Sequence, residues 1–144
     1  MSKTIESEPY QVIWLIRRLF RSLSQKSNEN LKEFGISVAD RAVLEFLYPD
    51  KILSVPEIAE QYQVTRQHVQ TTINSLLEAS LVVAKENPRH KRSQLMMLNS
   101  QGRMLFEILL KKDEKTIDVL FSHLSKNEIT ITRDTLQSLL KELS

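Results

Sequence analysis

The chain has 144 residues, 41% of them hydrophobic and 26% charged, and a formal net charge of +2. This length suits one domain with one core, and the composition is that of a folded globular protein rather than a disordered one. The lack of cysteine excludes disulfides, thiolate metal sites and cysteine catalysis, and two glycines with four prolines favour helices over a turn-rich β-architecture.

The first expected helix begins after Ser7, a good N-cap that is followed by Pro9. Apolar residues recur at helical spacing from Val12 to Leu23 and cover more than one stripe, so this helix needs more than one packing partner. The polar stretch 24–30 either carries the helix through solvent, to about residue 33, or breaks it. Both alternatives stay open, and Gly35 is a candidate C-cap.

Three short helices are expected next, over about 38–48, 55–61 and 65–79. The second begins with a capping box, Ser54-Val55-Pro56-Glu57, and the third with the N-cap Thr65. The spacing of apolar side chains predicts that the buried face of the third helix consists of Val69, Ile73, Leu76 and Leu77.

Two short apolar runs, 81–84 and 94–98, predict a β-hairpin. The turn between them is basic, because residues 85–92 hold four cations and one carboxylate. Asn99 is expected to cap a long helix over 100–123, and Ser125 a final one. The apolar stripe of the final helix consists of Leu136, Leu139, Leu140 and Leu143.

Three short helices followed by a hairpin form the layout of a winged helix-turn-helix. The predicted fold class is therefore mainly α, with a two-stranded β wing and with N- and C-terminal dimerisation helices. We expect residues 1–144 to form a single domain in which 37–98 is a DNA-binding lobe. The flanking segments 8–33 and 100–143 carry more apolar surface than a lone lobe covers, which predicts a homodimer.

Five short segments occur in a characteristic order. They are Phe34-Gly35-Ile36-Ser37 (similar to L-G-L/I-T/S), 53–60 (similar to LTxxELA), Val64-Thr65-Arg66-Gln67-His68-Val69 (V-S/T-R-x-x-V), 87–92 (in the place of DPxDRR) and 98–102 (in the place of LTxxG). In register over nearly the whole chain, they resemble the MarR family of bacterial transcription regulators. Four positions depart from the family pattern: Asn87 and His90 replace acidic wing residues, Ser80 stands where a glycine is usual, and Thr71 where a basic residue often contacts phosphate.

The resemblance implies a DNA-binding transcriptional regulator, a repressor by family habit, that binds a pseudo-palindromic operator in double-stranded DNA as a homodimer. It also implies a small aromatic effector that releases the protein from DNA. Tyr10 and Trp14 are the candidate effector-binding residues, and packing in the core or dimer is the alternative for both. The alternative function is a winged helix used for protein–protein assembly, without sequence-specific DNA binding, in which the basic hairpin meets an acidic partner.

The polar face of the third short helix supports DNA binding from the residues themselves. With its apolar face inward, this helix exposes amide and hydroxyl side chains able to reach base edges. Gln67 and Gln70 are the best base readers, because an amide pairs with the N6/N7 edge of adenine. The remaining candidate DNA-binding residues are Thr65, Arg66 and Thr71 toward phosphate, His68 and Asn74 on the helix face, and Arg89, Lys91 and Arg92 at the wing tip, toward the minor groove. The alternative is a merely solvated polar face.

Neither metal nor cofactor is expected. His68, His90 and His123 do not stand at the i, i+4 spacing of ligands on a helix. The carboxylates between residues 113 and 118 are interleaved with lysines, which predicts a salt-bridged surface. Enzyme chemistry is not predicted, because the sequence has neither a glycine-rich phosphate loop nor a GxSxG motif.

No stretch approaches the roughly 20 uninterrupted apolar residues of a membrane span, and residues 1–8 lack the apolar core of a signal peptide. We therefore expect a cytoplasmic protein with no membrane partner.

Overall fold

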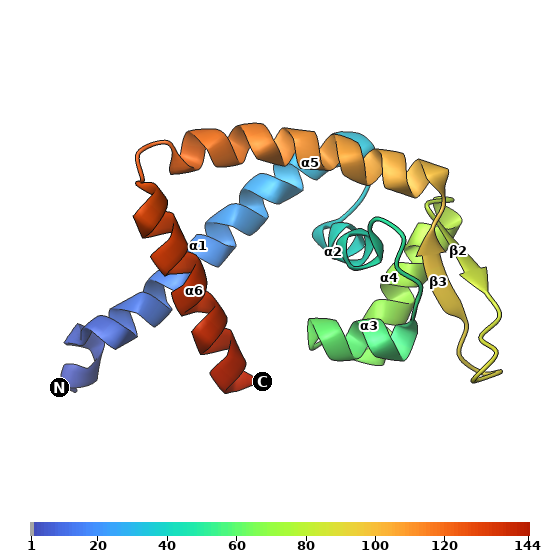
Figure 1. The fold of residues 1–144 in the computed structure, drawn as a ribbon, viewed down its shortest axis with the longest axis horizontal. Coiled ribbons are helices and arrows are strands. Elements are labelled where there is room, and N and C mark those ends of the chain that lie inside the picture. The colour runs from blue at the N-terminus through green and yellow to red at the C-terminus, as the bar shows by residue number, and fades with distance from the viewer. Residues whose placement is uncertain (1) are drawn as a thin grey trace. The chain divides into compact units, whose positions relative to one another are not determined.

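The computed structural model describes residues 2–144, which form six α-helices, three short strands and two 3₁₀ turns (Figure 1). The chain divides into two compact units, a first that ends at Phe106 and a second formed by Glu107–Ser144. The elements are a 3₁₀ turn (Lys3–Glu6), α1 (Glu8–Leu31), a second 3₁₀ turn (Lys32–Phe34), α2 (Val38–Leu47), β1 (Leu53–Ser54), α3 (Val55–Tyr62), α4 (Arg66–Glu78), β2 (Val82–Lys85), β3 (Leu95–Leu98), α5 (Ser100–Phe121) and α6 (Lys126–Leu143).

The helix starts confirm the predicted caps. Ser7 accepts a hydrogen bond from the backbone N–H of Tyr10, and Asn99 Oδ1 accepts one from the N–H of Gly102 at 2.8 Å. Complete capping boxes join Ser37 to Asp40, Ser54 to Glu57 and Ser125 to Glu128. Each box satisfies two backbone donors that a helix start leaves without partners. In the last one, hydrogen bonds from the backbone and side chain of Ser125 lower the pKa of Glu128.

The open question about residues 24–30 is decided in favour of a continuous helix. α1 runs without interruption to Leu31, and the 3₁₀ turn that follows ends at Gly35. Gly35 adopts the left-handed conformation, with φ = 67°, which suits a residue without Cβ and explains its role as a C-cap.

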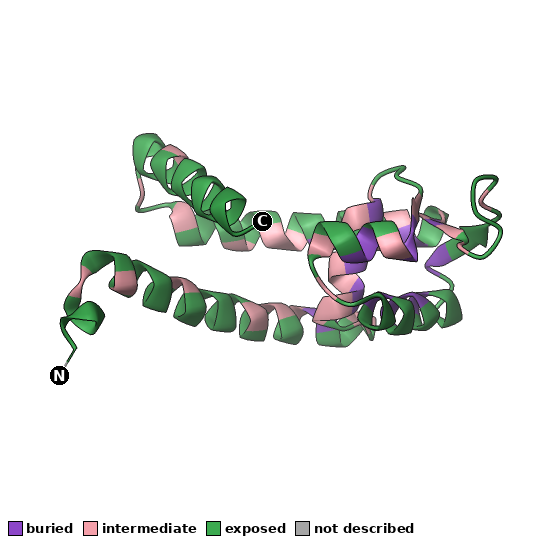
Figure 2. Cartoon of the chain, turned by 90° about the horizontal axis from the view of Figure 1, so that it is seen from below, coloured by how far each residue is buried: buried purple, intermediate pink, exposed green. Residues whose placement is uncertain are grey.

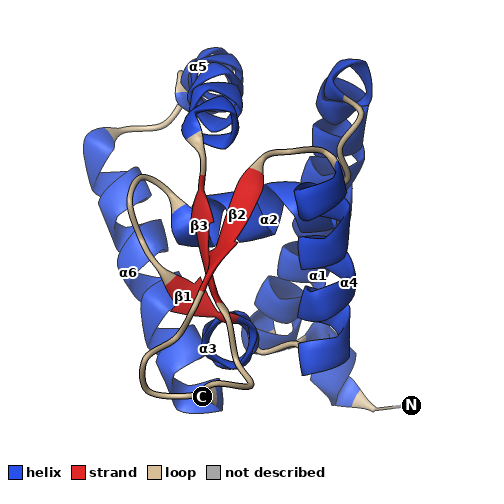
Figure 3. Ribbon diagram, turned by 90° about the vertical axis from the view of Figure 1, so that its right-hand side faces the viewer, coloured by secondary structure: helices blue, strands red, loops and turns tan. Residues whose placement is uncertain are grey.

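The sheet has one strand more than the predicted two-stranded wing. Strand β1 pairs with β3, which also pairs with β2, giving the antiparallel order β1-β3-β2 (Figure 3). Leu53 lies opposite Met96 and Ser54 opposite Leu95. The sequence pattern missed β1 because two residues show no alternation, and because Ser54 was assigned to a helix start. An N-cap residue has extended backbone angles, however, so Ser54 both caps α3 and pairs in the sheet.

The core of the first unit lies among α2, α3, α4 and the sheet (Figure 2). Leu44, Leu47 and Ile58 have no exposed side-chain surface, and Phe106 is stacked edge-on against Tyr48 with 5.0 Å between ring centroids. The side chains that complete this core from α4 and the sheet are Val69, Ile73, Leu76, Val82, Met96 and Leu98.

One predicted core residue of α4 is wrong. Leu77 is 36% exposed, and Thr72 is buried in its place, with 5% of its surface exposed. The buried positions thus follow i, i+3, i+4 and i+7 from Val69, a stripe as wide as the predicted one but turned toward Thr72. Thr72 tolerates burial because its hydroxyl donates to the carbonyl oxygen of His68 at 3.0 Å.

Apolar side chains remain exposed along α1 and α6 within this single chain. Phe20 is 70% exposed and Leu15 58% exposed, and α6 has no buried residue. On α6 the predicted apolar stripe is present but uncovered, with Leu140 63% exposed. None of the helices in residues 2–144 is long and apolar enough to cross a membrane.

A glycine is required where α5 leaves the sheet. The backbone of Gly102 lies so close to the Leu81 carbonyl oxygen that an added Cβ would overlap this atom, and it would also press on the Leu98 side chain. Both neighbours belong to the packed core, and the Leu81 oxygen accepts a hydrogen bond from the N–H of Asn99. The backbone there has little freedom to retreat.

We predict that Gly102→Ala lowers the free energy of unfolding by about 1–3 kcal/mol, because α5 must shift away from the α4–β2 turn. Denaturant titration measures this loss. Gln101→Ala, at the neighbouring exposed position of α5, is the matched control and should change stability by less than about 0.5 kcal/mol. Equal stability of the two variants would contradict the close approach at Gly102.

Candidate nucleic-acid interface

Helix α4 follows α3 through a tight turn and presents one polar face. Gln63 ends α3 in the left-handed conformation, with φ = 59°, and the Thr65 hydroxyl accepts from the N–H of His68 at 3.0 Å to begin α4. With the stripe from Val69 to Leu76 buried, the opposite face is exposed. It carries all the residues that the sequence predicted there: Arg66, Gln67, His68, Gln70, Thr71 and Asn74.

Two contacts order the side chains on this face. Gln70 Nε2 donates a hydrogen bond to Asn74 Oδ1 at 2.9 Å, and the Thr71 hydroxyl donates to the Gln67 carbonyl oxygen at 3.0 Å. The Thr71 proton is therefore used inside the helix, and the Thr65 oxygen already caps it. These two hydroxyls are less available to a ligand than the amides.

A groove of about 690 Å³ runs between α4 and the loop that joins β2 to β3. Leu77, Met96 and Pro56 contribute apolar surface to it. The structure brings together here several candidate residues that are distant in sequence: Arg66, Gln67, Gln70 and Asn74 from α4, and Lys91 and Arg92 from the wing. The groove is thus lined by three amides and one cation on the α4 side and by two cations on the wing side.

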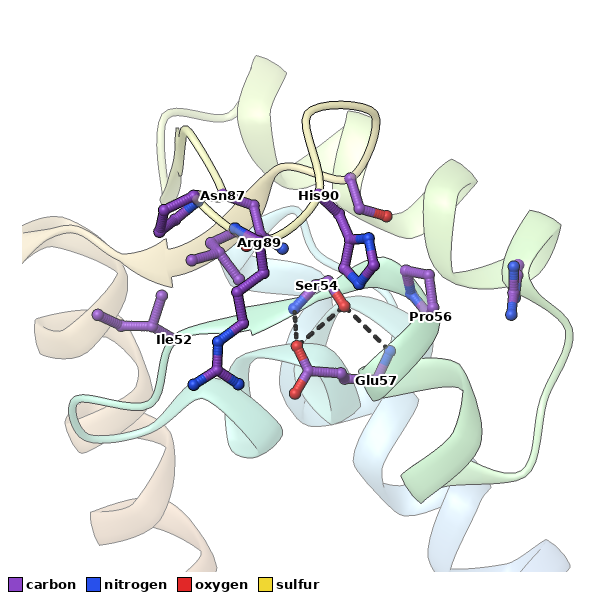
Figure 4. A pocket seen from close by; sticks show the side chains of 11 residues that line it. Ile52, Ser54, Pro56, Glu57, Asn87, Arg89 and His90 are labelled. Atoms are coloured by element: carbon purple, nitrogen blue, oxygen red, sulfur yellow. Dashed lines mark hydrogen bonds between the residues drawn. The ribbon is translucent and has the colours of Figure 1, made fainter.

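A second cavity, of about 620 Å³, lies on the other side of the wing loop, against the start of α3 (Figure 4). Arg89 extends between Ile52 and Glu57 in this view, and His90 lies above Pro56. Glu57 is already engaged, because its Oε1 accepts from the Ser54 N–H at 3.0 Å and from the Ser54 hydroxyl at 2.9 Å. Arg89 lines this second cavity and not the groove, whereas Lys91 and Arg92 line the groove.

Arg66 lines both cavities, as do Pro56 and Ser93, and it is the one charged residue that they share. It occupies the first position of α4, where the helix N-terminus also attracts anions. Cationic side chains therefore extend from one cavity to the other.

The wing tip is shaped by Asn87, a role that the sequence did not reveal. Its side-chain oxygen accepts from the N–H of Arg89 at 3.0 Å, and its carbonyl oxygen accepts from the N–H of His90 at 3.3 Å. Such a turn is typical of Asn and Asp alike, so the amide forms it without the acidic residue that the family pattern has here. Within residues 2–144, no carboxylate forms an ion pair with Arg89, Lys91 or Arg92.

Ser80 also shows how a departure from the family pattern is accommodated. It adopts φ = 58°, the left-handed conformation that favours glycine. Its carbonyl oxygen accepts from Asn99 Nδ2 at 2.6 Å, and its N–H donates to the Leu77 carbonyl oxygen at 3.1 Å. These bonds hold the serine in a conformation that it rarely adopts.

The two candidate effector residues lie together near the start of α1. Tyr10 and Trp14 line a cavity of about 370 Å³ with Ile5 and Gln11, and the Arg18 guanidinium lies 6.0 Å from the centroid of the Trp14 ring. In the described part of the chain, no three histidine, aspartate or glutamate side chains are grouped so as to hold a metal ion.

The chain resembles known proteins in sequence and in fold. A sequence model of the MarR family matches residues 34–93. Over 94 residues the chain is 30% identical to an uncharacterized protein of Mycobacterium tuberculosis, an alignment covering 65% of this chain and 66% of that protein.

Two crystal structures share the fold over most of their length. A MarR family transcription regulator superimposes with a TM-score of 0.85 at 22% identity, covering 98% of this chain and 94% of its own. The S. aureus MepR–DNA complex superimposes with a TM-score of 0.80 at 24% identity, covering 91% of this chain and 96% of MepR. The segment that the family model matches contains α2, α3, α4 and most of the wing loop, and over this segment the sequence is that of the MarR family of winged helix-turn-helix transcription regulators.

Proposed function

We propose that the protein is a DNA-binding transcriptional regulator, acting as a repressor, that binds a pseudo-palindromic operator as a homodimer in the cytoplasm. The observation that carries this proposal is the groove between α4 and the wing, where Gln67 and Gln70 face Lys91 and Arg92. Amides that read base edges and cations that neutralise phosphates are the two kinds of group that a DNA-binding surface needs. The similarity in fold to MepR bound to DNA supports the same conclusion.

In this proposal α4 enters the major groove and residues 37–98 form the DNA-binding lobe. Gln67 and Gln70 contact base edges, with His68 and Asn74 beside them on the same exposed face. Arg66 and Thr65 contact phosphate near the helix N-terminus. Thr71 also contacts phosphate, by exchanging its hydrogen bond to the Gln67 carbonyl oxygen for one to the phosphate. The cations Arg89, Lys91 and Arg92 enter the minor groove or approach the phosphates beside it.

The apolar surfaces of α1 and α6 support the homodimer. Leu15, Leu19 and Phe20 on α1 are each more than half exposed, as are Leu140 and Leu143 on α6. A monomer in water seldom exposes so many large apolar side chains on one helix, because their burial against a partner is worth about 25 cal/mol per Å². We therefore assign segments 8–33 and 100–143 to dimerisation.

The cavity of Tyr10 and Trp14 is the proposed effector site. Its volume of about 370 Å³ fits a molecule with one aromatic ring, and two of the four residues that line it are aromatic. A small aromatic compound that binds there and lowers DNA affinity would be the releasing effector.

The decisive experiment is selection of bound duplexes from a random pool, followed by footprinting. We expect a pseudo-palindrome with half-site centres roughly 10 base pairs apart, because a two-fold dimer places equivalent helices in successive major grooves. Protection should show two symmetric arms. Protection of one asymmetric half-site, or of none above background at low salt, would favour the assembly function, in which the wing binds an acidic protein.

We predict that Arg92→Ala weakens binding to all duplexes alike. Removal of one phosphate contact should lower the slope of log affinity against log salt concentration by about one unit. Binding isotherms at several salt concentrations measure this slope. Lys126→Ala removes an exposed cation of α6 that lines neither cavity, and it should leave the slope unchanged. The assignment of the wing is wrong if both variants behave alike.

We predict that Leu140→Asp shifts the protein toward monomer and weakens DNA binding with it, since a charge in an apolar interface has no partner. Sedimentation equilibrium measures the first effect and binding to the selected duplex the second. Ser138→Asp adds the same charge to α6 outside the apolar stripe and should preserve the dimer. A folded wild-type monomer at micromolar concentration would refute the dimer.

A further inference from the structure

The amide pair on α4 carries information about which base the protein reads. Gln70 and Asn74 stand one helical turn apart, both are exposed, and both line the groove that faces Arg92. Gln70 Nε2 donates to Asn74 Oδ1 at 2.9 Å. Within residues 2–144 neither amide has another hydrogen bond, so this contact alone orders the two groups.

The direction of this hydrogen bond decides what Gln70 offers to a ligand. An amide oxygen only accepts and an amide nitrogen only donates. Because Asn74 Oδ1 accepts, the Gln70 nitrogen is turned toward Asn74 and one of its two protons is used there. Gln70 then has its oxygen and its second N–H left, which are one acceptor and one donor on neighbouring atoms.

That remaining pair matches one purine and not the other. Adenine presents the N6 amino group, a donor, beside N7, an acceptor, and so pairs with an acceptor and a donor. Guanine presents two acceptors, O6 and N7, which require two donors. Held by Asn74, Gln70 has one donor left, and its oxygen would face the O6 of guanine.

We propose that Asn74 is a positioning residue, which fixes the Gln70 amide so that Gln70 reads an adenine and rejects guanine at one position of each half-site. This inference rests on the proposed DNA-binding function. Asn74 acts through Gln70 here and is not itself the base reader. Without Asn74 the Gln70 amide is free to turn over and present two donors, so that the discrimination between the purines is lost.

The test uses the duplex that the wild-type protein selects from a random pool, and duplexes in which each A·T pair is replaced singly by G·C. Wild type should prefer A·T by roughly tenfold at one position per half-site. Gln70→Ala should abolish this preference, and Asn74→Ala should reduce it to about threefold or less. In a Gln70→Ala background, Asn74→Ala should have no further effect on the preference.

Asn74→Asp is the matched variant. A carboxylate only accepts, so it holds Gln70 in the same orientation and should retain the tenfold preference, while its charge near the phosphates lowers affinity for every duplex alike. Both positions of change are on the exposed face, so thermal unfolding followed by circular dichroism should be unaltered in all three single variants.

Three results would each overturn this inference and leave the proposed DNA-binding function standing. The first is a guanine preference that depends on Gln70, and the second is an undiminished adenine preference in Asn74→Ala. The third is an effect of Asn74→Ala that persists in full without Gln70. The last would make Asn74 an independent contact. Failure of the wild-type protein to show salt-dependent binding to any duplex would overturn the proposed function itself, which is a distinguishable outcome.

Discussion

The structure depends on the burial of one face of α4. Val69, Ile73 and Leu76 have no exposed surface, and Thr72 is only 5% exposed. Full burial of such aliphatic side chains is worth about 1.5–3 kcal/mol each, so turning α4 about its axis would cost roughly 5 kcal/mol or more. The rotation of α4 is therefore fixed by residues that never touch a ligand. The exposed face contributes little to that core, which leaves its amides and cations available for recognition.

The wing is oriented by the same core through the sheet. β3 is held on both sides, by β1 and by β2, and its Met96 and Leu98 are buried. The basic loop runs from the end of β2 to the start of β3, so the sheet holds both of its ends. At its tip Asn87 closes a turn by hydrogen bonds to the backbone of Arg89 and His90. The wing cations are placed by backbone geometry, and among residues 2–144 no carboxylate is paired with them.

Much of this arrangement follows from local sequence signals, and the exceptions have physical causes. The serine caps, the Asn99 cap and the helix periods are short-range features, so they predict the helices to within a few residues. Leu77 was assigned to the core because its side chain is apolar. The buried stripe of four positions is instead turned to the other side, where Thr72 is buried with its hydroxyl hydrogen-bonded. β1 escaped prediction because its partner lies more than forty residues away.

The candidate DNA-binding residues were identified by their type and their exposed face. Their division between two cavities, with Arg89 apart from Arg92, depends on the path of the wing loop, which no local pattern records.

The start of α5 joins the wing to the end of α4. Asn99 follows β3 directly, donates from its side chain to the Ser80 carbonyl oxygen and caps α5 through Gly102. Arg103, in the same turn, donates to Asp50 at 2.7 Å on the loop after α2. Since Ser80 is already held in a left-handed conformation and Gly102 has no room to move, a change in direction of α5 at this turn must shift the end of α4 or break these bonds.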